Sequence, residues 1–198
     1  MSTNIITLTD SYKVGHHKMM PPNTEEVYSY FEARKGAKFP STVFFGLQAI
    51  LKKYFVGQVV TDEKIEKADV IFKAHFGSDS FFDRKTWEYI IKKHSGKLPL
   101  EIRAVPEGLL VPINNVLMTV RNTDDNCPMT NYFETILTHT WYGTTVATLS
   151  HATKDIIRKY MELSADHLGG LDFMLHDFAF RGVSSLESAG IGGLGHLI

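Results

Sequence analysis

The fold prediction depends on Leu171-Asp172-Phe173-Met174-Leu175-His176-Asp177-Phe178 and on Ser184-Ser185-Leu186-Glu187, which follows closely. The first segment is an apolar run of the length typical of a buried strand, and Gly169-Gly170 separates it from the preceding residues. Ser184 and Glu187 match a capping box, which predicts that a helix begins directly after the strand. A strand leading into a helix is the opening step of an α/β barrel or of a layered α/β domain.

Residues 1–168 alternate between helical and extended patterns. A strand is predicted at 27–34, helices at 44–55, 61–76 and 84–93, a small antiparallel meander at 100–120, and a long helical stretch from Thr130 to about Leu163, broken at Tyr142-Gly143. This mixture predicts an α+β domain over residues 1–168. Residues 169–198 then form the first strand-helix unit of a second, α/β domain.

Composition excludes several classes of protein. Of the 198 residues 43% are hydrophobic and 22% charged, and the net charge is −1 with no basic stripe, so no nucleic-acid partner is expected. No apolar run is long enough to cross a bilayer. The single cysteine, Cys127, rules out an internal disulfide framework and indicates a reducing compartment. We therefore expect a cytoplasmic protein without a membrane partner.

The sequence stops on apolar residues, Gly190-Ile191-Gly192-Gly193-Leu194-Gly195-His196-Leu197-Ile198. This ending has two interpretations: a short helix docked on the core, or a chain cut within a domain. The three glycines at 190, 192 and 195 match a dinucleotide-binding fingerprint, but they fall inside the predicted helix rather than before it. Close packing of that helix against a neighbour is the favoured interpretation.

The segment from His176 to Gly182 carries residues suited to binding at a strand end. Phe178 could stack on a flat ligand, and Arg181 could hold a phosphate through two parallel hydrogen bonds. On the pattern alone the structural alternative is favoured, with Phe178 in the core and Arg181 in an ion pair. His176-Asp177 also matches the metal pair of HD-type phosphohydrolases, but the other histidines lack ligand spacing.

Thr9-Asp10-Ser11-Tyr12-Lys13 is open to the same two interpretations. Asp10 or Ser11 could cap a short helix, with Tyr12 half-exposed in its first turn. Alternatively, Asp10 supplies a hydrogen-bond acceptor, Tyr12 a stacking face and Lys13 a positive charge.

Several separated blocks together resemble one family, the nicotinamide phosphoribosyltransferases. In chain order they are Thr9–Lys13 with His16, Pro21–Thr24, Tyr28–Glu32 with Arg34, Phe45–Gln48, Ala104–Gly108, Asn122–Asp124, Asn131–Leu137 and His176–Ser185. Their order and approximate spacing match the family across nearly the whole chain.

The resemblance implies a type II phosphoribosyltransferase, with an α+β N-terminal domain followed by an irregular α/β barrel that is truncated here. Members of the family are homodimers whose active sites form across the subunit interface. They join nicotinamide to phosphoribosyl pyrophosphate with the help of Mg²⁺, giving nicotinamide mononucleotide and pyrophosphate in NAD salvage.

The resemblance also implies roles for particular residues. Phe178 would contact one face of the nicotinamide ring, and Tyr12 from the partner subunit the other. Asp10 would lie near the amide and discourage a carboxylate substrate. Arg181 would contact ring and phosphate, and Arg34 would reach the phosphate region from the partner chain. His176 and Asp177 also match the family, are expected to shape the strand end, and are given no catalytic step; the catalytic residues stay unknown.

Two departures from the family pattern bear on function. Ala179 and Phe180 stand where the family has a Gly-Tyr pair. The family's chain also continues well past Ile198, so this chain is expected to be an incomplete and inactive part of the enzyme. Two alternatives stay open: a nicotinate-specific phosphoribosyltransferase, and a non-catalytic dimerising or ligand-binding fragment.

Overall fold

The structure, a computed structural model, describes residues 3–198. They form two compact units, each assembled from separate stretches of chain. The first unit contains the residues up to Phe31, Ile50–Ala104 and Met118–Thr138, and the second contains Glu32–Ala49, Val105–Leu117 and His139–Ile198. Residues 169–198 belong to the second unit, and the domain boundary that the sequence predicts at 168/169 stays a prediction.

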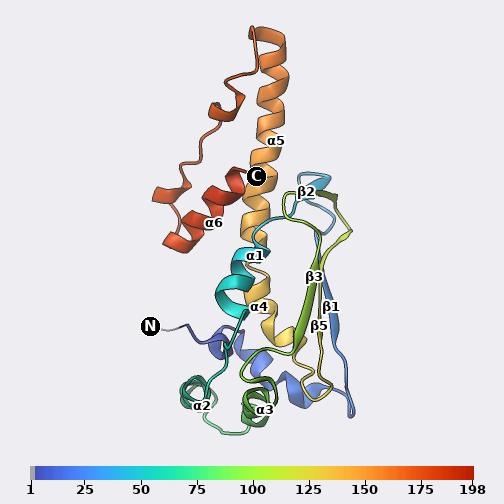
Figure 1. The fold of residues 1–198 in the computed structure, drawn as a ribbon, viewed down its shortest axis with the longest axis vertical. Helices are drawn as coiled ribbons and strands as arrows, with labels where there is room; N and C mark the ends of the chain where they lie inside the picture. Colours follow the sequence, from blue (N-terminus) through green and yellow to red (C-terminus); the bar gives the residue numbers. More distant parts are fainter. Residues whose placement is uncertain (1–2) are drawn as a thin grey trace. The chain divides into compact units, whose positions relative to one another are not determined.

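Helices and short strands alternate along the chain (Figure 1). In chain order they are η1 Ile5–Thr7, η2 Ser11–Met19, β1 Tyr28–Glu32, β2 Ser41–Val43, α1 Leu47–Ile50, η3 Leu51–Phe55, α2 Asp62–Phe76, α3 Arg84–His94, β3 Leu100–Ala104, β4 Leu110–Pro112, β5 Val116–Asn122, η4 Thr130–Phe133, α4 Glu134–Leu137, α5 Thr140–Ser164, η5 Leu171–Phe173, η6 Ala179–Arg181 and α6 Leu186–His196. This is the mixed α/β composition that the sequence predicts.

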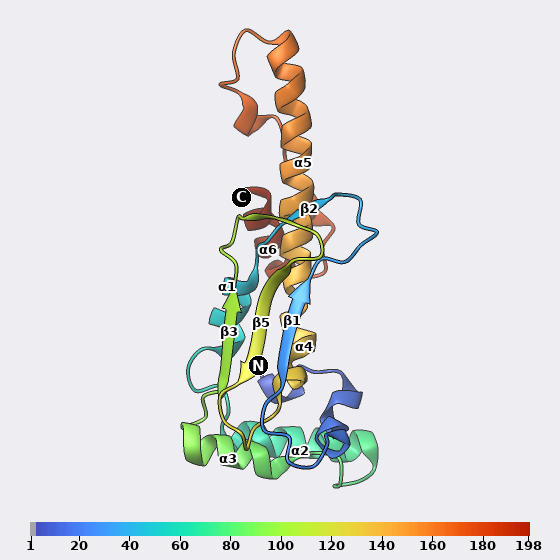
Figure 2. The ribbon, with the colours of Figure 1, turned by 90° about the vertical axis from the view of Figure 1, so that its right-hand side faces the viewer.

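The predicted meander over residues 100–120 is wrong in its pairing. β5 lies between β1 and β3 in a three-stranded sheet, and β3 pairs with β5 antiparallel, Leu100 opposite Asn122 (Figure 2). β4 instead pairs with β2 in a separate two-stranded sheet, Thr42 opposite Val111. Alternation identifies strands but not their partners, and here the partner of β4 comes from far earlier in the chain.

α2 and α3 begin and end where the sequence predicts. The Thr61 hydroxyl accepts a hydrogen bond from the Lys64 N–H at 3.3 Å, so its side chain caps α2. Gly77 ends α2 with φ of 63°, and Ser95 ends α3 with φ of 53°, both left-handed conformations that stop a helix. The two helices lie side by side at one end of the three-stranded sheet (Figure 2).

An aromatic cluster fills the core of the first unit. The Trp87 ring lies 5.2 Å from Tyr132 and 6.2 Å from Phe133, edge to face, and Phe55 lies 5.6 Å from Phe133. The Tyr132 hydroxyl donates to the Ile6 carbonyl at 2.7 Å, and burial raises its pKa. A buried phenol is thus kept protonated and paired, as a low-dielectric core requires.

Asp124 is the centre of a hydrogen-bond network in the first unit. Its carboxylate accepts from the Asn126 backbone N–H at 2.9 Å, from His94 Nε2 at 2.7 Å and from the Tyr89 hydroxyl at 3.1 Å. These bonds, the Asn126 N–H first, outweigh desolvation and lower the pKa of Asp124 to about 2. The same carboxylate acts on Cys127, which lies nearby. Burial and the negative charge of Asp124 raise the pKa of the Cys127 thiol to about 12.

In the second unit, threonines on α5 bond to the backbone of the neighbouring segment 42–45. Thr144 Oγ1 accepts from the Phe45 N–H at 3.2 Å and donates to the Phe45 carbonyl at 3.0 Å. One turn later, Thr148 Oγ1 accepts from the Val43 N–H at 2.9 Å. These hydroxyls give backbone groups of this segment hydrogen-bond partners in addition to those that β4 provides.

The predicted helix break at Tyr142-Gly143 is wrong, because the interruption falls at Thr138–His139 and α5 runs straight through Gly143. A Cβ on Gly143 would lie 3.0 Å from the Phe45 carbonyl oxygen, so this glycine permits close packing. No helix within residues 3–198, the 25-residue α5 included, is both long and apolar enough to cross a membrane.

α6 packs closely on α5, and two of its four glycines, Gly192 and Gly195, explain how. A Cβ on Gly195 would lie 3.0 Å from the Gly143 carbonyl oxygen, and one on Gly192 would lie 2.9 Å from the Tyr142 hydroxyl. Nothing lies within 4 Å of a Cβ built on Gly190. Close helix packing is therefore confirmed for two of the glycines.

The strand predicted at Leu171–Phe178 is wrong. Leu171–Phe173 forms a 3-10 turn, Met174–Phe178 is irregular, and Leu171 alone among these residues is buried. The backbone finds its partners locally, since Phe173 N–H donates to Gly170 O at 3.0 Å, and among residues 3–198 no strand pairs with this segment. The helix cap is Ser185 rather than Ser184, because the Ser185 hydroxyl accepts from Ser188 N–H at 3.0 Å.

Replacing Thr144 by valine should destabilise the protein. The change keeps the shape of the side chain but leaves a buried N–H and a buried carbonyl of Phe45 without this partner, which costs about 1–3 kcal/mol in free energy of unfolding. Urea denaturation measures the loss. Thr153→Val is the matched control on the same helix, because the Thr153 hydroxyl donates only to the Leu149 carbonyl at an exposed site. Equal losses for both variants would contradict the assignment.

The Asp124 network should make the free energy of unfolding depend on pH in the acidic range. Because the folded-state pKa lies below that of an unfolded aspartate, about 3.9, the contribution is present above pH 4 and is lost as pH falls toward 2. In urea denaturations between pH 2.5 and 6, Asp124→Asn should show a shallower fall than the unmodified chain. Asp125→Asn, at an exposed neighbour, should keep the original slope.

Candidate functional site

Asp10 is held in place by a threonine of α4. Thr135 Oγ1 donates to Asp10 Oδ2 at 2.7 Å, and the Asp10 backbone N–H donates to the same hydroxyl oxygen at 3.1 Å. The carboxylate makes no capping bond to η2, so the prediction that its side chain caps a helix is wrong. Asp10 is exposed, and its fixed carboxylate is available as an acceptor.

Tyr12 presents its ring to solvent beside a buried lysine. The side chain is 61% exposed, while Lys13 is 3% exposed and forms an ion pair with Glu134. The ring lies 5.2 Å from that of His16, and the Lys13 ammonium lies 5.1 Å from the Tyr12 ring centre. The predicted free positive charge of Lys13 is thus already neutralised by Glu134.

Sequence reasoning did not identify Glu134 and Thr135. Both lie within the block Asn131–Leu137, but nothing in a Glu-Thr pair on a helix indicates a partner more than one hundred residues earlier in the chain. Their contacts hold the start of η2 on both sides of Tyr12. The exposed ring of Tyr12 is therefore held in place by contacts among Asp10, Lys13, Glu134 and Thr135.

Phe178 and Arg181 lie together at the surface of the second unit. Phe178 is 68% exposed, so the alternative that places it in the core is wrong. The Arg181 guanidinium carbon lies 5.6 Å from the centre of the Phe178 ring, and within the described part of the chain Arg181 forms no ion pair. Asp177 Oδ1 accepts from the Ala179 N–H at 2.8 Å and fixes the turn that carries both side chains.

Phe178 borders an open apolar groove. The groove is lined by Phe173, Leu175, Phe178, Phe180, Leu186, Leu194 and Leu197, together with polar residues that include His176 and Asp177. Most of these large side chains are exposed. An exposed aromatic ring beside a guanidinium can stack on a flat ligand and hold an anionic group next to it.

Arg34 lies in a different hollow of the second unit. It lines a cavity of about 300 Å³ with Lys38, Trp141 and Thr145, and none of the Phe178 groove residues takes part. Neither Arg34 nor Lys38 forms an ion pair with another described residue. Two unneutralised cations and a hydroxyl suit an anion such as a phosphate.

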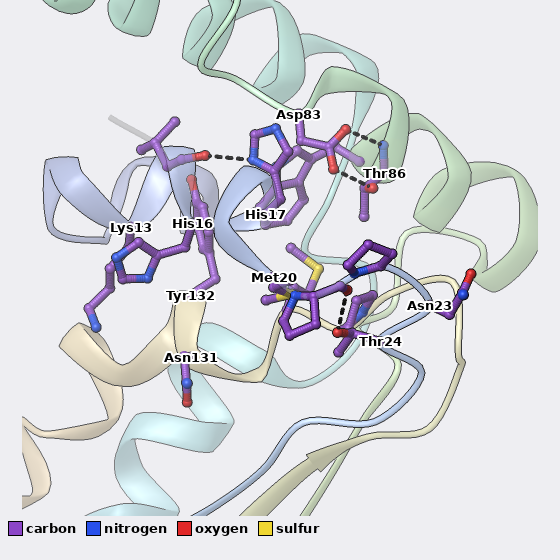
Figure 3. A pocket seen from close by; sticks show the side chains of 16 residues that line it. Lys13, His16, His17, Met20, Asn23, Thr24, Asp83, Thr86, Asn131 and Tyr132 are labelled. Carbon is purple, nitrogen blue, oxygen red and sulfur yellow. Dashed lines mark hydrogen bonds between the residues drawn. The ribbon is translucent and has the colours of Figure 1, made fainter.

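The first unit contains a further pocket, of about 410 Å³, that the sequence did not predict (Figure 3). Its walls come from η2, the turn at Pro21–Thr24, the start of α3 and the segment Pro128–Tyr132. Asn23 closes the turn with φ of 63°, and Thr24 Oγ1 donates to the Pro21 carbonyl at 2.7 Å. Three blocks of the family resemblance thus meet here.

A metal site is not formed by these residues. Within residues 3–198, no three histidine, cysteine, aspartate or glutamate side chains lie close enough together to hold an ion. A divalent cation that accompanies a phosphorylated substrate would therefore not find a ligand set among these residues.

The Thr135 contact should control how firmly Asp10 is held. Thr135→Val removes both hydrogen bonds at nearly constant volume, so hydrogen exchange at the Asp10 amide should accelerate by about tenfold. Thr135→Ser retains the hydroxyl and should restore slow exchange. Rapid exchange in the serine variant as well would show that packing, and not the hydroxyl, holds the segment.

The chain is similar to a known protein family and to several known proteins. The family model described as "Nicotinamide phosphoribosyltransferase, N-terminal domain" matches residues 4–102, half of the chain. A nicotinamide phosphoribosyltransferase of Xanthomonas campestris pv. campestris is 43% identical over 98% of this chain, and one of Acinetobacter baylyi is 30% identical over 98%. In both cases the chain spans 41% of the relative's length.

Among solved structures, a crystal structure of human nicotinic acid phosphoribosyltransferase is similar, with 19% identity and a TM-score of 0.49. The match covers 72% of this chain and 27% of the human one. The family assignment rests on the matched half of the chain, and by that match the chain belongs to the nicotinamide phosphoribosyltransferase family.

Proposed function

We propose that this chain is the part of a nicotinamide phosphoribosyltransferase that supplies stacking and phosphate-binding groups to the active site. The enzyme would transfer the phosphoribosyl group of phosphoribosyl pyrophosphate to nicotinamide, in the cytoplasm, for NAD salvage. One structural observation supports this above the others. Tyr12 and Phe178, the two rings that the resemblance assigns to nicotinamide, are 61% and 68% exposed, and fixed neighbours hold each of them.

Stacking suits the substrate. Nicotinamide is flat and uncharged, so two aromatic faces bind it with little loss of side-chain entropy. We propose that Phe178 covers one face and that Tyr12 of a partner subunit covers the other, which requires a homodimer. The fold would then be that of a type II phosphoribosyltransferase, with an α/β barrel that residues 169–198 begin.

The reaction exchanges one bond to the ribose C1 carbon for another. The ring nitrogen of nicotinamide forms a bond to C1 as the C1–O bond to pyrophosphate breaks, and the electron pair leaves with the pyrophosphate. Negative charge therefore grows on the leaving group, and cationic side chains that contact it accelerate the reaction. Arg181, next to Phe178, and Arg34, beside Lys38, have the charge and exposure for this task.

Asp10 would select the amide over the acid. A fixed carboxylate can accept a hydrogen bond from the amide NH₂ of nicotinamide and repels the carboxylate of nicotinate. Thr135 occupies one of its oxygens, Oδ2, and leaves Oδ1 for a ligand. Mg²⁺ would enter with phosphoribosyl pyrophosphate and bind its phosphate oxygens, since the described residues offer no set of ligands.

A chimera tests the proposal directly. Residues 1–198 replace the matching segment of the Xanthomonas campestris relative, and nicotinamide mononucleotide formation is measured. Phe178→Ala should reduce kcat/KM by about tenfold or more, the loss expected for one aromatic stack of about 1.5 kcal/mol. Phe173→Ala, another exposed ring on the same groove, is the control and should change little. An unchanged kcat/KM for Phe178→Ala would refute the stacking role.

The same chimera separates the remaining alternatives. Preference for nicotinate over nicotinamide would overturn the role of Asp10. The 198-residue chain by itself should form no product, because it spans only 41% of the length of these relatives. Turnover by that chain would contradict this expectation.

A further inference from the structure

The pocket of about 410 Å³ in the first unit is separate from every residue assigned to nicotinamide or phosphate. Asp10, Tyr12, Arg34, Phe178 and Arg181 are all absent from its walls. Its volume lies within the range of pockets that hold small molecules. Figure 3 shows the side chains of four separate segments converging on it.

The pocket walls are largely flat and apolar. Pro21 and Pro22 form part of one wall, and Met20 and Met129 supply polarizable surface. Rigid proline rings and adaptable methionine side chains can pack on a planar ring with little loss of conformational freedom. The apolar lining therefore favours a compact aromatic body.

The lining of this pocket includes two hydrogen-bond acceptors, the Asp83 carboxylate and the His17 ring. Asp83 caps α3, and its carboxylate accepts from the Thr86 N–H at 3.4 Å and from the Thr86 hydroxyl at 2.6 Å. Both partners are uncharged, and no lysine, arginine or histidine in residues 3–198 forms an ion pair with Asp83. Its negative charge is thus not neutralised within the described chain.

His17 adds a second acceptor. Its Nδ1 lies 3.0 Å from the Val14 carbonyl oxygen, which can only accept, so Nδ1 carries the hydrogen. In the neutral ring Nε2 then presents a lone pair, and no described residue donates to it. A ligand with N–H donors would satisfy both Nε2 and the carboxylate of Asp83.

An anion is disfavoured, although a helix N-terminus is a common anion site. Here the Asp83 carboxylate already occupies the end of α3 and would repel a second negative charge. The one lysine among the lining residues, Lys13, is paired with Glu134. We propose that this pocket binds a small planar organic cation with N–H donors, of the aromatic amine or amidine class.

Three ligands of the same shape test the assignment. Benzamidine is cationic, benzamide is neutral and benzoate is anionic. Each ligand is titrated into the 198-residue protein, and NMR follows the signals of the Thr86 amide and the Trp87 indole. Benzamidine should shift both signals and bind about tenfold more tightly than benzamide, the factor for one charge-assisted hydrogen bond. Stronger binding of benzoate, or no shift with benzamidine, would overturn the proposal.

Asp83→Asn isolates the charge, because asparagine caps a helix as well as aspartate does. It should weaken benzamidine binding about tenfold and leave benzamide binding unchanged. Asp62→Asn, in the first turn of α2 and outside the pocket, is the matched control and should change neither. Unchanged benzamidine affinity in Asp83→Asn would show that the carboxylate does not bind the cation. This test does not depend on nicotinamide binding, so its failure would leave the proposed function standing.

Discussion

Every buried backbone N–H and carbonyl needs a hydrogen-bond partner, and in this protein side chains supply many of the partners that short strands cannot. Thr144 satisfies both backbone groups of Phe45 in the second unit. In the first unit Asn122 likewise bonds to backbone groups just before β1. Its Oδ1 accepts from the Val27 N–H at 2.8 Å, and its Nδ2 donates to the Glu25 carbonyl at 2.7 Å. Small polar residues therefore hold together segments that are far apart in sequence.

Polar side chains also hold the backbone in place at the candidate site. Tyr12 and Phe178 lie on 3-10 turns or beside them, and such turns are too short to fix a side chain by themselves. Each ring depends on a polar residue close by: Thr135 holds the segment before Tyr12, and Asp177 holds the turn that carries Phe178. Substrate-binding geometry would thus be as sensitive to these supporting hydroxyl and carboxylate groups as to the rings themselves.

Local features were predictable from the sequence, and features that depend on distant contacts were not. The helices predicted at 61–76 and 84–93 follow from patterns of neighbouring residues, and the structure has them at Asp62–Phe76 and Arg84–His94. The partner of β4, and the absence of a strand at 171–178, depend on which other segments lie alongside. The exposed rings were identified through family resemblance. The pocket with Asp83 was missed because its walls come from four segments that no single pattern links.

The reactivity of the Cys127 thiol can report local unfolding of the first unit. It is the only cysteine in the chain, it is fully buried, and its pKa of about 12 leaves almost no thiolate at neutral pH. A thiol reagent can therefore react only after the surrounding structure has opened. The rate of covalent labelling would measure how often this core exposes itself, without any engineered probe, and ligands that bind only the closed form would slow that rate.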